Sequence, residues 1–302
     1  MPNIIAIDLG GTKLSAALLD EAGSVLQSHT EPTEQAGRSA LISQLTTVVR
    51  RLSQGQEVLA VGLGSPGFID TEQGVVIMAT NLVGWTQTRV KDKLEQMTGL
   101  PVVVMNDANA AALGEAWLGA GKNRQSFVML TLGTGVGGAI YHRQSGIWLG
   151  SNHQGGEFGH SILYPGGRPC PCGQFGCVDQ YLSGRAVQSA YQVLTGQDCT
   201  CEQIFQGAAD GEALAVRIIQ EFARDLATHL ISLQNIIDPE IFILGGGLAA
   251  AHSVWGELLD KQLQQLTGPG SVVRWQLAET GALAGLLGAG RLAWDLVERN
   301  RA

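Results

Sequence analysis

Apolar residues in the first third of the chain fall into short runs separated by glycine-rich turns, and this spacing predicts a mixed α/β fold. Three strands are expected first, at residues 4–7, 14–19 and 25–30. Apolar positions then recur every three or four residues from 39 to 52, which indicates a helix. Further buried strands at 58–63 and 102–105, each followed by helical spacing, give the order strand, strand, strand, helix, strand, helix, strand, helix.

The same order begins again after residue 126, which predicts an internal duplication. The second half is expected to contain strands at 127–132, 137–142, 147–149 and 241–244, and a long helix at 213–236. We therefore expect two lobes around one cleft, over residues 1–118 and 119–289. A C-terminal helix, 290–302, is expected to pack back on the first lobe.

Composition and charge narrow the class of protein. The chain has 302 residues, more than one comfortable core holds, and 45% of them are hydrophobic. Its net charge is −8 without a dense Lys/Arg patch, so nucleic acid and anionic membranes are poor partner candidates. The first apolar run breaks at Asp8, short of a signal peptide or a membrane span. Three of the five cysteines crowd between Cys170 and Cys177, which favours a reducing cytoplasm and a metal site.

Two glycine turns each follow a buried strand. The first reads Asp8-Leu9-Gly10-Gly11-Thr12-Lys13, and the second reads Gly133-Thr134-Gly135-Val136-Gly137. Paired glycines let the backbone approach a phosphate and direct its N–H groups at it, while Asp8 can hold Mg²⁺. Either turn alone is equally consistent with an ordinary hairpin. The two together predict a site for a phosphorylated ligand.

The pair Asn106-Asp107 ends one predicted strand and opens a helix. Ligands of α/β proteins gather at such strand ends, and a carboxylate there can accept a hydroxyl proton during phosphoryl transfer. Asp107 could equally cap the helix that follows, and capping is the commoner role for such a residue. The motif alone leaves both interpretations open.

A histidine and three closely spaced cysteines have the spacing of a metal site. The predicted ligands are His160, Cys170, Cys172 and Cys177. One imidazole and three thiolates suit tetrahedral zinc, and four protein ligands indicate a structural rather than a catalytic ion. Cys199 and Cys201 resemble a further pair, but nothing nearby in the sequence completes a site, so we interpret them as ordinary thiols.

With these motifs identified, the chain resembles the ROK family (repressor, open reading frame, kinase), and most of all its bacterial glucokinase branch. The matching segments are DLGGTK at 8–13, GLGSPGFID at 62–70, NLVGW at 81–85, NDANAAALGEAWLGAG at 106–121, LGTGVGG at 132–138, GEFGH at 156–160, CPCGQFGCVDQYLSG at 170–184 and ILGGGL at 243–248. They cover nearly the whole chain, and the zinc segment is the most specific of them.

The resemblance implies a two-lobed, actin-like (ribonuclease-H-like) sugar kinase fold with duplicated lobes and a zinc-binding loop. It implies that Asp107 is the general base for the 6-hydroxyl of a hexose. The implied sugar-binding residues are Asn81, Asn106, Asp107, Gly138, Glu157, His160 and Asp179. The implied ATP-binding residues are Asp8, Gly10, Gly11, Thr12, Lys13, Gly133, Thr134, Gly135, Gly137, Gly245, Gly246 and Gly247, the last three beside the adenosine. Members of the family are usually homodimers or dimers of dimers.

One position departs from the family pattern. The family usually has Glu two residues after the last zinc cysteine, where its side chain reaches the sugar, but this chain has Asp179 there. The carboxylate is one methylene closer to the backbone, which puts sugar specificity at this position in doubt. Glu157 argues against N-acetylmannosamine as the substrate, because N-acetylmannosamine kinases of the family tend to have His at this position.

Several functions stay open within and beyond the kinases. Glucose is the favoured substrate, N-acetylglucosamine is the alternative because YLSG at 181–184 also occurs in that branch, and mannose and fructose remain possible. A sugar-sensing transcriptional regulator of the same family is disfavoured. Such regulators carry a helix-turn-helix domain before the first phosphate loop, and only seven residues precede Asp8 here.

Overall fold

The computed structural model describes residues 2–79 and 81–301 and divides the chain into two compact units. The first unit contains residues 1–123, 140–155 and 279–302, and the second contains 124–139 and 156–278. These units differ from the predicted lobes because residues 119–123, 140–155 and 279–289 group with the N-terminal part of the chain. Residue 302, the end of the predicted C-terminal helix, lies outside the described residues.

The first unit is built on a five-stranded sheet in the order β3-β2-β1-β4-β8. Its strands are β1 (Asn3–Leu9), β2 (Lys13–Leu19), β3 (Val25–Pro32), β4 (Val58–Ser65) and β8 (Val102–Asn106). β1 pairs antiparallel with β2 and parallel with β4, and β4 pairs parallel with β8. The carboxyl ends of β1, β4 and β8 therefore lie at the same edge of the sheet.

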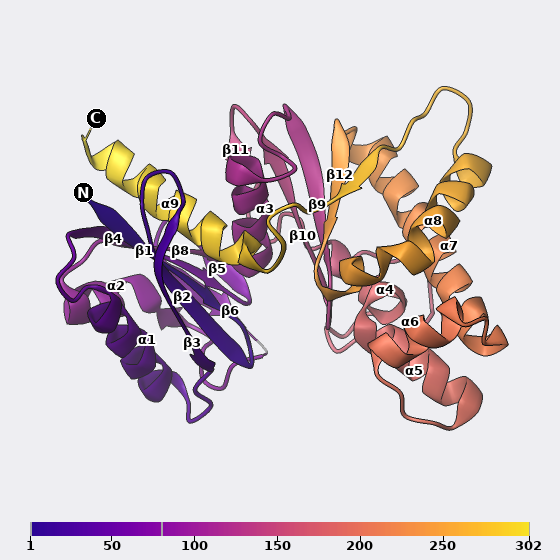
Figure 1. The fold of residues 1–302 in the computed structure, drawn as a ribbon, viewed down its shortest axis with the longest axis horizontal. Coiled ribbons are helices and arrows are strands. Elements are labelled where there is room, and N and C mark those ends of the chain that lie inside the picture. The colour runs from indigo at the N-terminus through magenta and orange to yellow at the C-terminus, as the bar shows by residue number, and fades with distance from the viewer. Residues whose placement is uncertain (1, 80, 302) are drawn as a thin grey trace. The chain divides into compact units, whose positions relative to one another are not determined.

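Alternation along β1 explains why both faces of this sheet are covered. Ile5 and Ile7 belong to a core cluster with α1 (Arg38–Leu52) and α2 (Val90–Thr98). Ile4 and Ala6 point to the other face, where they pack with α9 (Ala284–Arg301). Figure 1 shows α9 crossing the first unit beside α3 (Asp107–Leu118).

The packing of α9 requires glycine at specific positions. A Cβ added at Gly288 would lie 1.6 Å from the backbone oxygen of Ala110 in α3. A Cβ at Gly62 of β4 would lie 1.8 Å from the backbone oxygen of Ala289. The backbones of α3, α9 and β4 thus lie in direct contact. This contact fixes the position of the part of α9 that lies at the edge of the sheet.

The second five-stranded sheet repeats the topology of the first, with the order β11-β10-β9-β12-β13. Its strands are β9 (Ser126–Leu132), β10 (Val136–His142), β11 (Gly146–Ile147), β12 (Ile241–Gly245) and β13 (Trp275–Leu277). The chain passes from the second unit to the first within β10, and β11 pairs with the end of that strand. The two sheets have the same strand order position by position, so the predicted duplication of the fold is confirmed.

The helices of the second unit lie between β11 and β13 in the sequence. They are η1 (Phe158–His160, 3₁₀), α4 (Asp179–Leu182), α5 (Gly184–Thr195), α6 (Cys201–Ala209), α7 (Ala213–Ile237), η2 (Gly247–Ala251, 3₁₀) and α8 (His252–Leu266). A short 3₁₀ helix, η3 (Gly281–Leu283), precedes α9 in the first unit. The long predicted helix at 213–236 corresponds to α7. No helix among the described residues is long and apolar enough to cross a membrane.

A small antiparallel sheet in the first unit was absent from the predicted elements. It consists of β5 (Phe68–Asp70), β6 (Val75–Met78) and β7 (Thr88–Arg89). These strands have two to four residues, too few for an alternating pattern to be visible in the sequence.

Candidate functional site

The first glycine turn joins β1 to β2 and is held by residues that follow β3. The N–H of Gly10 donates to the carbonyl oxygen of Lys13 at 2.9 Å, which closes the turn. Thr33 donates its N–H to the Thr12 oxygen and its hydroxyl to the Gly10 oxygen, at 3.0 and 2.8 Å. Gln35 donates to the oxygen of Gly11 at 2.8 Å. The carbonyl oxygens of Gly10, Gly11 and Thr12 thus accept from protein donors, whereas the N–H groups of Gly11 and Thr12 have no partner among the described residues, which suits them to an anion.

Two carboxylates lie at the same edge of the sheet as this turn. Asp8 belongs to the end of β1 and Asp107 is the first residue of α3, directly after β8. Burial raises the pKa of Asp8 to about 6, with a further contribution from the negative charge of Asp107 and a smaller opposing one from Lys13. Burial also raises the pKa of Asp107, although the N–H of Ala108, 2.9 Å from its carboxylate, opposes the shift.

Asn106, rather than Asp107, caps helix α3. Its side-chain oxygen accepts from the N–H groups of Ala108 and Asn109 at 2.9 and 3.1 Å. Its amide nitrogen donates to the oxygen of Gly67 at 3.0 Å, which leaves one N–H of Asn106 for a ligand. Because Asn106 serves as the cap, the carboxylate of Asp107 is not needed for that role.

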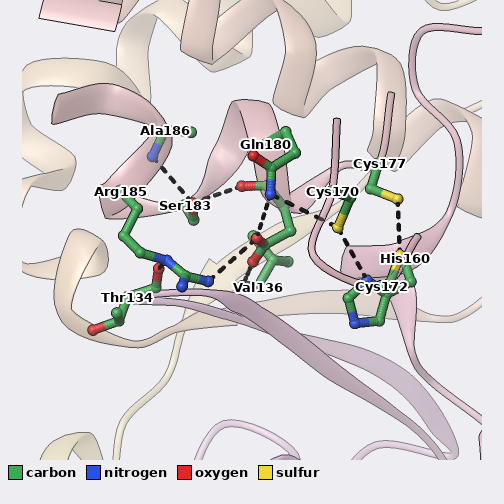
Figure 2. Close-up of polar contacts among 11 residues, drawn as sticks. Thr134, Val136, His160, Cys170, Cys172, Cys177, Gln180, Ser183, Arg185 and Ala186 are labelled. Carbon is green, nitrogen blue, oxygen red and sulfur yellow. Dashed lines mark hydrogen bonds and ion pairs between the residues drawn. The ribbon is translucent and has the colours of Figure 1, made fainter. Parts of the chain in front are cut away.

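The second glycine turn joins β9 to β10 and is held from α4 and α5. The N–H of Gly133 donates to the oxygen of Gly135 at 2.9 Å, and the N–H of Gly184 donates to the oxygen of Gly133 at 2.7 Å. Asp179 accepts from the N–H of Val136 at 2.8 Å, and the Nε of Arg185 donates to the oxygen of Thr134 at 2.9 Å. Figure 2 shows the contacts of Val136 and Arg185 beside the cysteine cluster.

A cavity of about 530 Å³ opens beside this second turn, entirely within the second unit. One wall comes from the turn and the start of α5, and the others come from α6, η2 and the start of α8. The lining residues are Gly133, Thr134, Gly184, Arg185, Gln188, Cys201, Glu202, Phe205, Gln206, Ala209, Gly247, Leu248, Ala250, Ala251, Ser253 and Val254. Its volume is in the range of sites for small molecules and cofactors.

The predicted metal ligands come together in one cluster. The ligand atoms of His160, Cys170, Cys172 and Cys177 all lie within 4.8 Å of one another. The sulfurs of Cys172 and Cys177 are 3.7 Å apart, and the sulfur of Cys170 is 3.8 Å from Nδ1 of His160. Sulfur atoms at the corners of a zinc tetrahedron are separated by roughly 3.7 Å. The donor set and its spacing therefore fit a four-coordinate zinc ion.

A sequence profile described as the ROK family matches residues 4–295. The chain belongs to the ROK family. It is 36% identical over 311 residues to a glucokinase from Streptomyces coelicolor, with 96% of each chain covered. It is 32% identical over 293 residues to an N-acetyl-D-glucosamine kinase from Aliivibrio fischeri. That alignment covers 93% of this chain and 96% of the kinase.

A solved ROK structure resembles the fold along its whole length. The ROK family glucokinase from Streptomyces griseus, determined with glucose and AMPPNP, matches with a TM-score of 0.84 and 33% identity over 97% of this chain and 99% of that one. The expectation of a two-lobed ROK kinase fold is therefore confirmed.

The ROK motifs predicted as site residues fall into two groups, one in each unit. Asp8, the turn at 10–13, Asn81, Asn106 and Asp107 belong to the first unit. A Cβ at Gly11 would lie 3.6 Å from the backbone oxygen of Asn81, so Asn81 lies beside the first turn. The second unit contains the second turn, the cysteine cluster, Gly138, Glu157, His160, Asp179 and the glycines at 245–247.

Two of the predicted glycines have a clear structural purpose in this ROK chain. A Cβ at Gly138 would lie 2.4 Å from the ring of Phe158, so glycine makes room for the helical turn between Glu157 and His160. Gly246 has φ +85°, and a Cβ added there would lie 2.4 Å from the backbone oxygen of Leu132. Of the glycines at 245–247, Gly247 lines the cavity.

Sequence reasoning missed one whole wall of the cavity. It comes from α6, where residues 201, 202, 205, 206 and 209 face the same space. This one-sided spacing is visible in the sequence, but it is equally typical of any helix that packs on a core. Arg185 was also missed, because a single arginine after Ser183-Gly184 carries no motif.

Proposed function

We propose that this ROK chain is an ATP-dependent hexose kinase that phosphorylates the 6-hydroxyl of glucose. The observation that carries the proposal is the placement of Asp107, a carboxyl group with a raised pKa, at the sheet edge that also holds the first glycine turn and Asp8. The ROK glucokinases that match the chain over nearly its full length support the choice of reaction.

In this reaction Asp107 is the general base. Its carboxylate accepts the proton of the 6-hydroxyl as that oxygen attacks the γ-phosphorus of ATP, and the bond to ADP breaks. The raised pKa of Asp107 makes its carboxylate a stronger proton acceptor than an ordinary aspartate. Asn106, Asn81, Glu157 and His160 are the candidates for holding the other hydroxyls of the sugar.

Two sets of backbone N–H groups are suited to the phosphates of ATP. They come from the first glycine turn at 10–13 and the second at 133–137. The cavity beside the second turn would hold the nucleoside, with Gly247 in its wall. Asp8 would hold Mg²⁺ together with the phosphates. That ion, when bound, neutralises charge on the β- and γ-phosphates.

Zn²⁺ would be held by His160, Cys170, Cys172 and Cys177, and its role would be structural because all four positions are filled by protein. Nδ1 of His160 faces the cluster. The opposite ring nitrogen is then the one that can bind a sugar hydroxyl, and the ion would fix the orientation of that ring.

Glucose is favoured over N-acetylglucosamine because the glucokinase relatives are more similar to the chain than the N-acetylglucosamine kinases. The sugar contact predicted for Asp179 stays a prediction. A cytoplasmic homodimer or dimer of dimers remains our expectation for the assembly.

A coupled assay for ADP release with glucose, N-acetylglucosamine, mannose, fructose and N-acetylmannosamine tests the proposal. We expect the highest kcat/KM with glucose, and product analysis should place the phosphate on the 6-oxygen. A higher kcat/KM with N-acetylglucosamine would make that sugar the substrate. Absence of ADP release with every sugar would contradict the kinase assignment itself.

A further inference from the structure

Arg185 is held at the mouth of the cavity by two contacts that occupy only part of its guanidinium. Its Nε donates to the backbone oxygen of Thr134 at 2.9 Å, and one terminal nitrogen lies 3.4 Å from the carboxylate of Asp179. A guanidinium has five N–H groups, so three remain. The side chain is 60% exposed, and Arg185 lines the cavity.

Asp179 is itself fixed, which makes it a firm support for Arg185. Its carboxylate is 9% exposed and accepts from the N–H of Val136 at 2.8 Å and from the amide of Gln180 at 3.1 Å. Gln180 also lies 3.7 Å from the sulfur of Cys170, so the support continues to the cysteine cluster (Figure 2). The direction of the Arg185 side chain is therefore set by buried groups.

Arg185 differs in charge from the other residues that line the cavity. Among the described residues that line it, Arg185 is the one cation and Glu202 is the one anion. A nucleoside triphosphate brings several negative charges, and the N–H groups of the second turn carry only partial positive charge. A planar guanidinium with unused N–H groups is suited to a phosphate oxygen.

The cavity has a turn end and a far end, and Arg185 is at the turn end. The sulfur of Cys201, in the first turn of α6, donates to the oxygen of Gly184 at 3.2 Å, and Gly184 in turn donates to Gly133. Ala209, eight residues further along the same helix, is about 12 Å away. Arg185 thus stands beside the glycine turn, whereas the space along α6 is left for the nucleoside.

We propose that Arg185 is a phosphate-binding residue of the nucleotide site, held for that contact by Asp179 and the oxygen of Thr134. The inference rests on the proposed function, because it needs a nucleotide in this cavity. It assigns to Arg185 a contact with the phosphate chain and none with the nucleoside.

Isothermal titration of the full-length protein with AMPPNP and, separately, with adenosine tests this, using the parent, Arg185→Met and Arg185→Lys. We expect Arg185→Met to weaken AMPPNP binding by about 10- to 100-fold and to change adenosine binding by less than about twofold. Arg185→Lys keeps the charge but not the fork geometry, so its loss of AMPPNP affinity should be smaller. Arg217→Met, which removes an exposed arginine paired with Glu221 outside the cavity, is the matched control and should bind like the parent.

The results that would contradict the inference can be told apart from those that would contradict the proposed function. Equal weakening of AMPPNP and adenosine by Arg185→Met would mean that Arg185 acts only through the shape of the turn, and unchanged AMPPNP affinity would exclude any role. Either result would overturn the inference and leave the proposed kinase function intact. A parent protein that binds neither AMPPNP nor ATP would overturn both.

Discussion

The two glycine turns of this ROK protein are built on the same framework but differ in what surrounds them. Each follows the first strand of its sheet, and each is closed by a hydrogen bond of 2.9 Å from its leading glycine, Gly10 or Gly133. The first is anchored by uncharged groups after β3, from Thr33 and Gln35. The second is anchored by the buried carboxylate of Asp179 and by Arg185.

The balance of charge beside the turns also differs, because the carboxylate beside the second turn, Asp179, is paired with a guanidinium. The first turn has the carboxylates of Asp8 and Asp107, whose pKa values are raised by burial. The second has the guanidinium of Arg185, and Thr131 stands where the first has Asp8. The first arrangement suits a cation and a proton acceptor, and the second suits an anion. The two turns thus share a framework of strands and differ in the side chains beside them.

The largest expected effect is at Asp107, the proposed base beside the first turn. Asp107→Asn keeps the shape of the side chain but removes the proton acceptor, so kcat should fall by about 100- to 10,000-fold. Glucose affinity should change only a few-fold, because binding does not require proton transfer. Steady-state kinetics and calorimetry with glucose measure the two effects. Asp92→Asn, an exposed aspartate paired with Arg89, is the control, and a kcat for Asp107→Asn within a few-fold of the parent would exclude the role of Asp107.

The next effect concerns the cluster that supports the second turn through Gln180. Cys172→Ser removes one of the four proposed metal ligands, so zinc in the purified protein should fall from about one ion per chain to nearly none. His160 then loses its fixed orientation, and the KM for glucose should rise by about 10- to 100-fold. Elemental analysis and kinetics check both results. Cys199→Ser is the control, and a parent protein that contains no zinc would contradict the prediction.

A smaller effect should follow from crowding Asp8 without changing any charge. A Cβ at Gly285, in the first turn of α9, would lie 2.8 Å from the carboxyl carbon of Asp8. Gly285→Ala should displace that carboxylate and lower kcat/KM for ATP by about tenfold. Gly256→Ala in α8 is the control, because its Cβ would meet only Trp275 at 3.5 Å. Equal kcat/KM values for both variants would show that the position of Asp8 does not matter.

The smallest expected effect is that of mild acid on the same carboxylates. The pKa of Asp8 is about 6, so about half of its charge is lost at pH 6 and about nine tenths at pH 5. Protonated Asp8 cannot hold Mg²⁺, so the loss of its charge alone should lower kcat/KM by about half at pH 6 and about tenfold at pH 5. Protonation of Asp107, whose pKa is also raised, removes the proton acceptor and acts in the same direction. A profile measured from pH 5 to 8 that stays flat would contradict these assignments.

Protonation of Asp8 should change the stability of the fold in the opposite direction from its effect on activity. The pKa of Asp8 is higher in the folded protein than in the unfolded chain, so the folded state binds the proton more tightly. The contribution of Asp8 to the free energy of unfolding is therefore present below about pH 4 and declines as pH rises to about 6. Activity is greatest where this residue stabilises the fold least, as expected for a functional site.

Sequence patterning predicted the parts of this fold that repeat. The strand-turn-strand units around Gly10 and Gly133, the helix at 213–236 and the duplicated sheets were all readable from apolar spacing. The short sheet at β5–β7 was not, because its strands are too short to alternate. The cluster of His160 and three cysteines was visible, since candidate metal ligands must be particular residue types at close spacing.

Three features of the site could be settled only by geometry. Asn106 and Asp107 are both suitable caps, and only the hydrogen bonds show that Asn106 takes that role. The faces of α6 look alike in the sequence, so its cavity wall was missed. The place of Arg185 beside the cavity depends on the direction of its flexible side chain, and contacts with Asp179 and Thr134 set that direction.

A crystal structure with glucose and AMPPNP is the most direct test of the contrast between the turns. We predict that a carboxylate oxygen of Asp107 lies within hydrogen-bond distance of the glucose 6-oxygen, while the guanidinium of Arg185 contacts a phosphate oxygen. A complex in which Asp107 lies out of reach of every sugar hydroxyl would contradict the account.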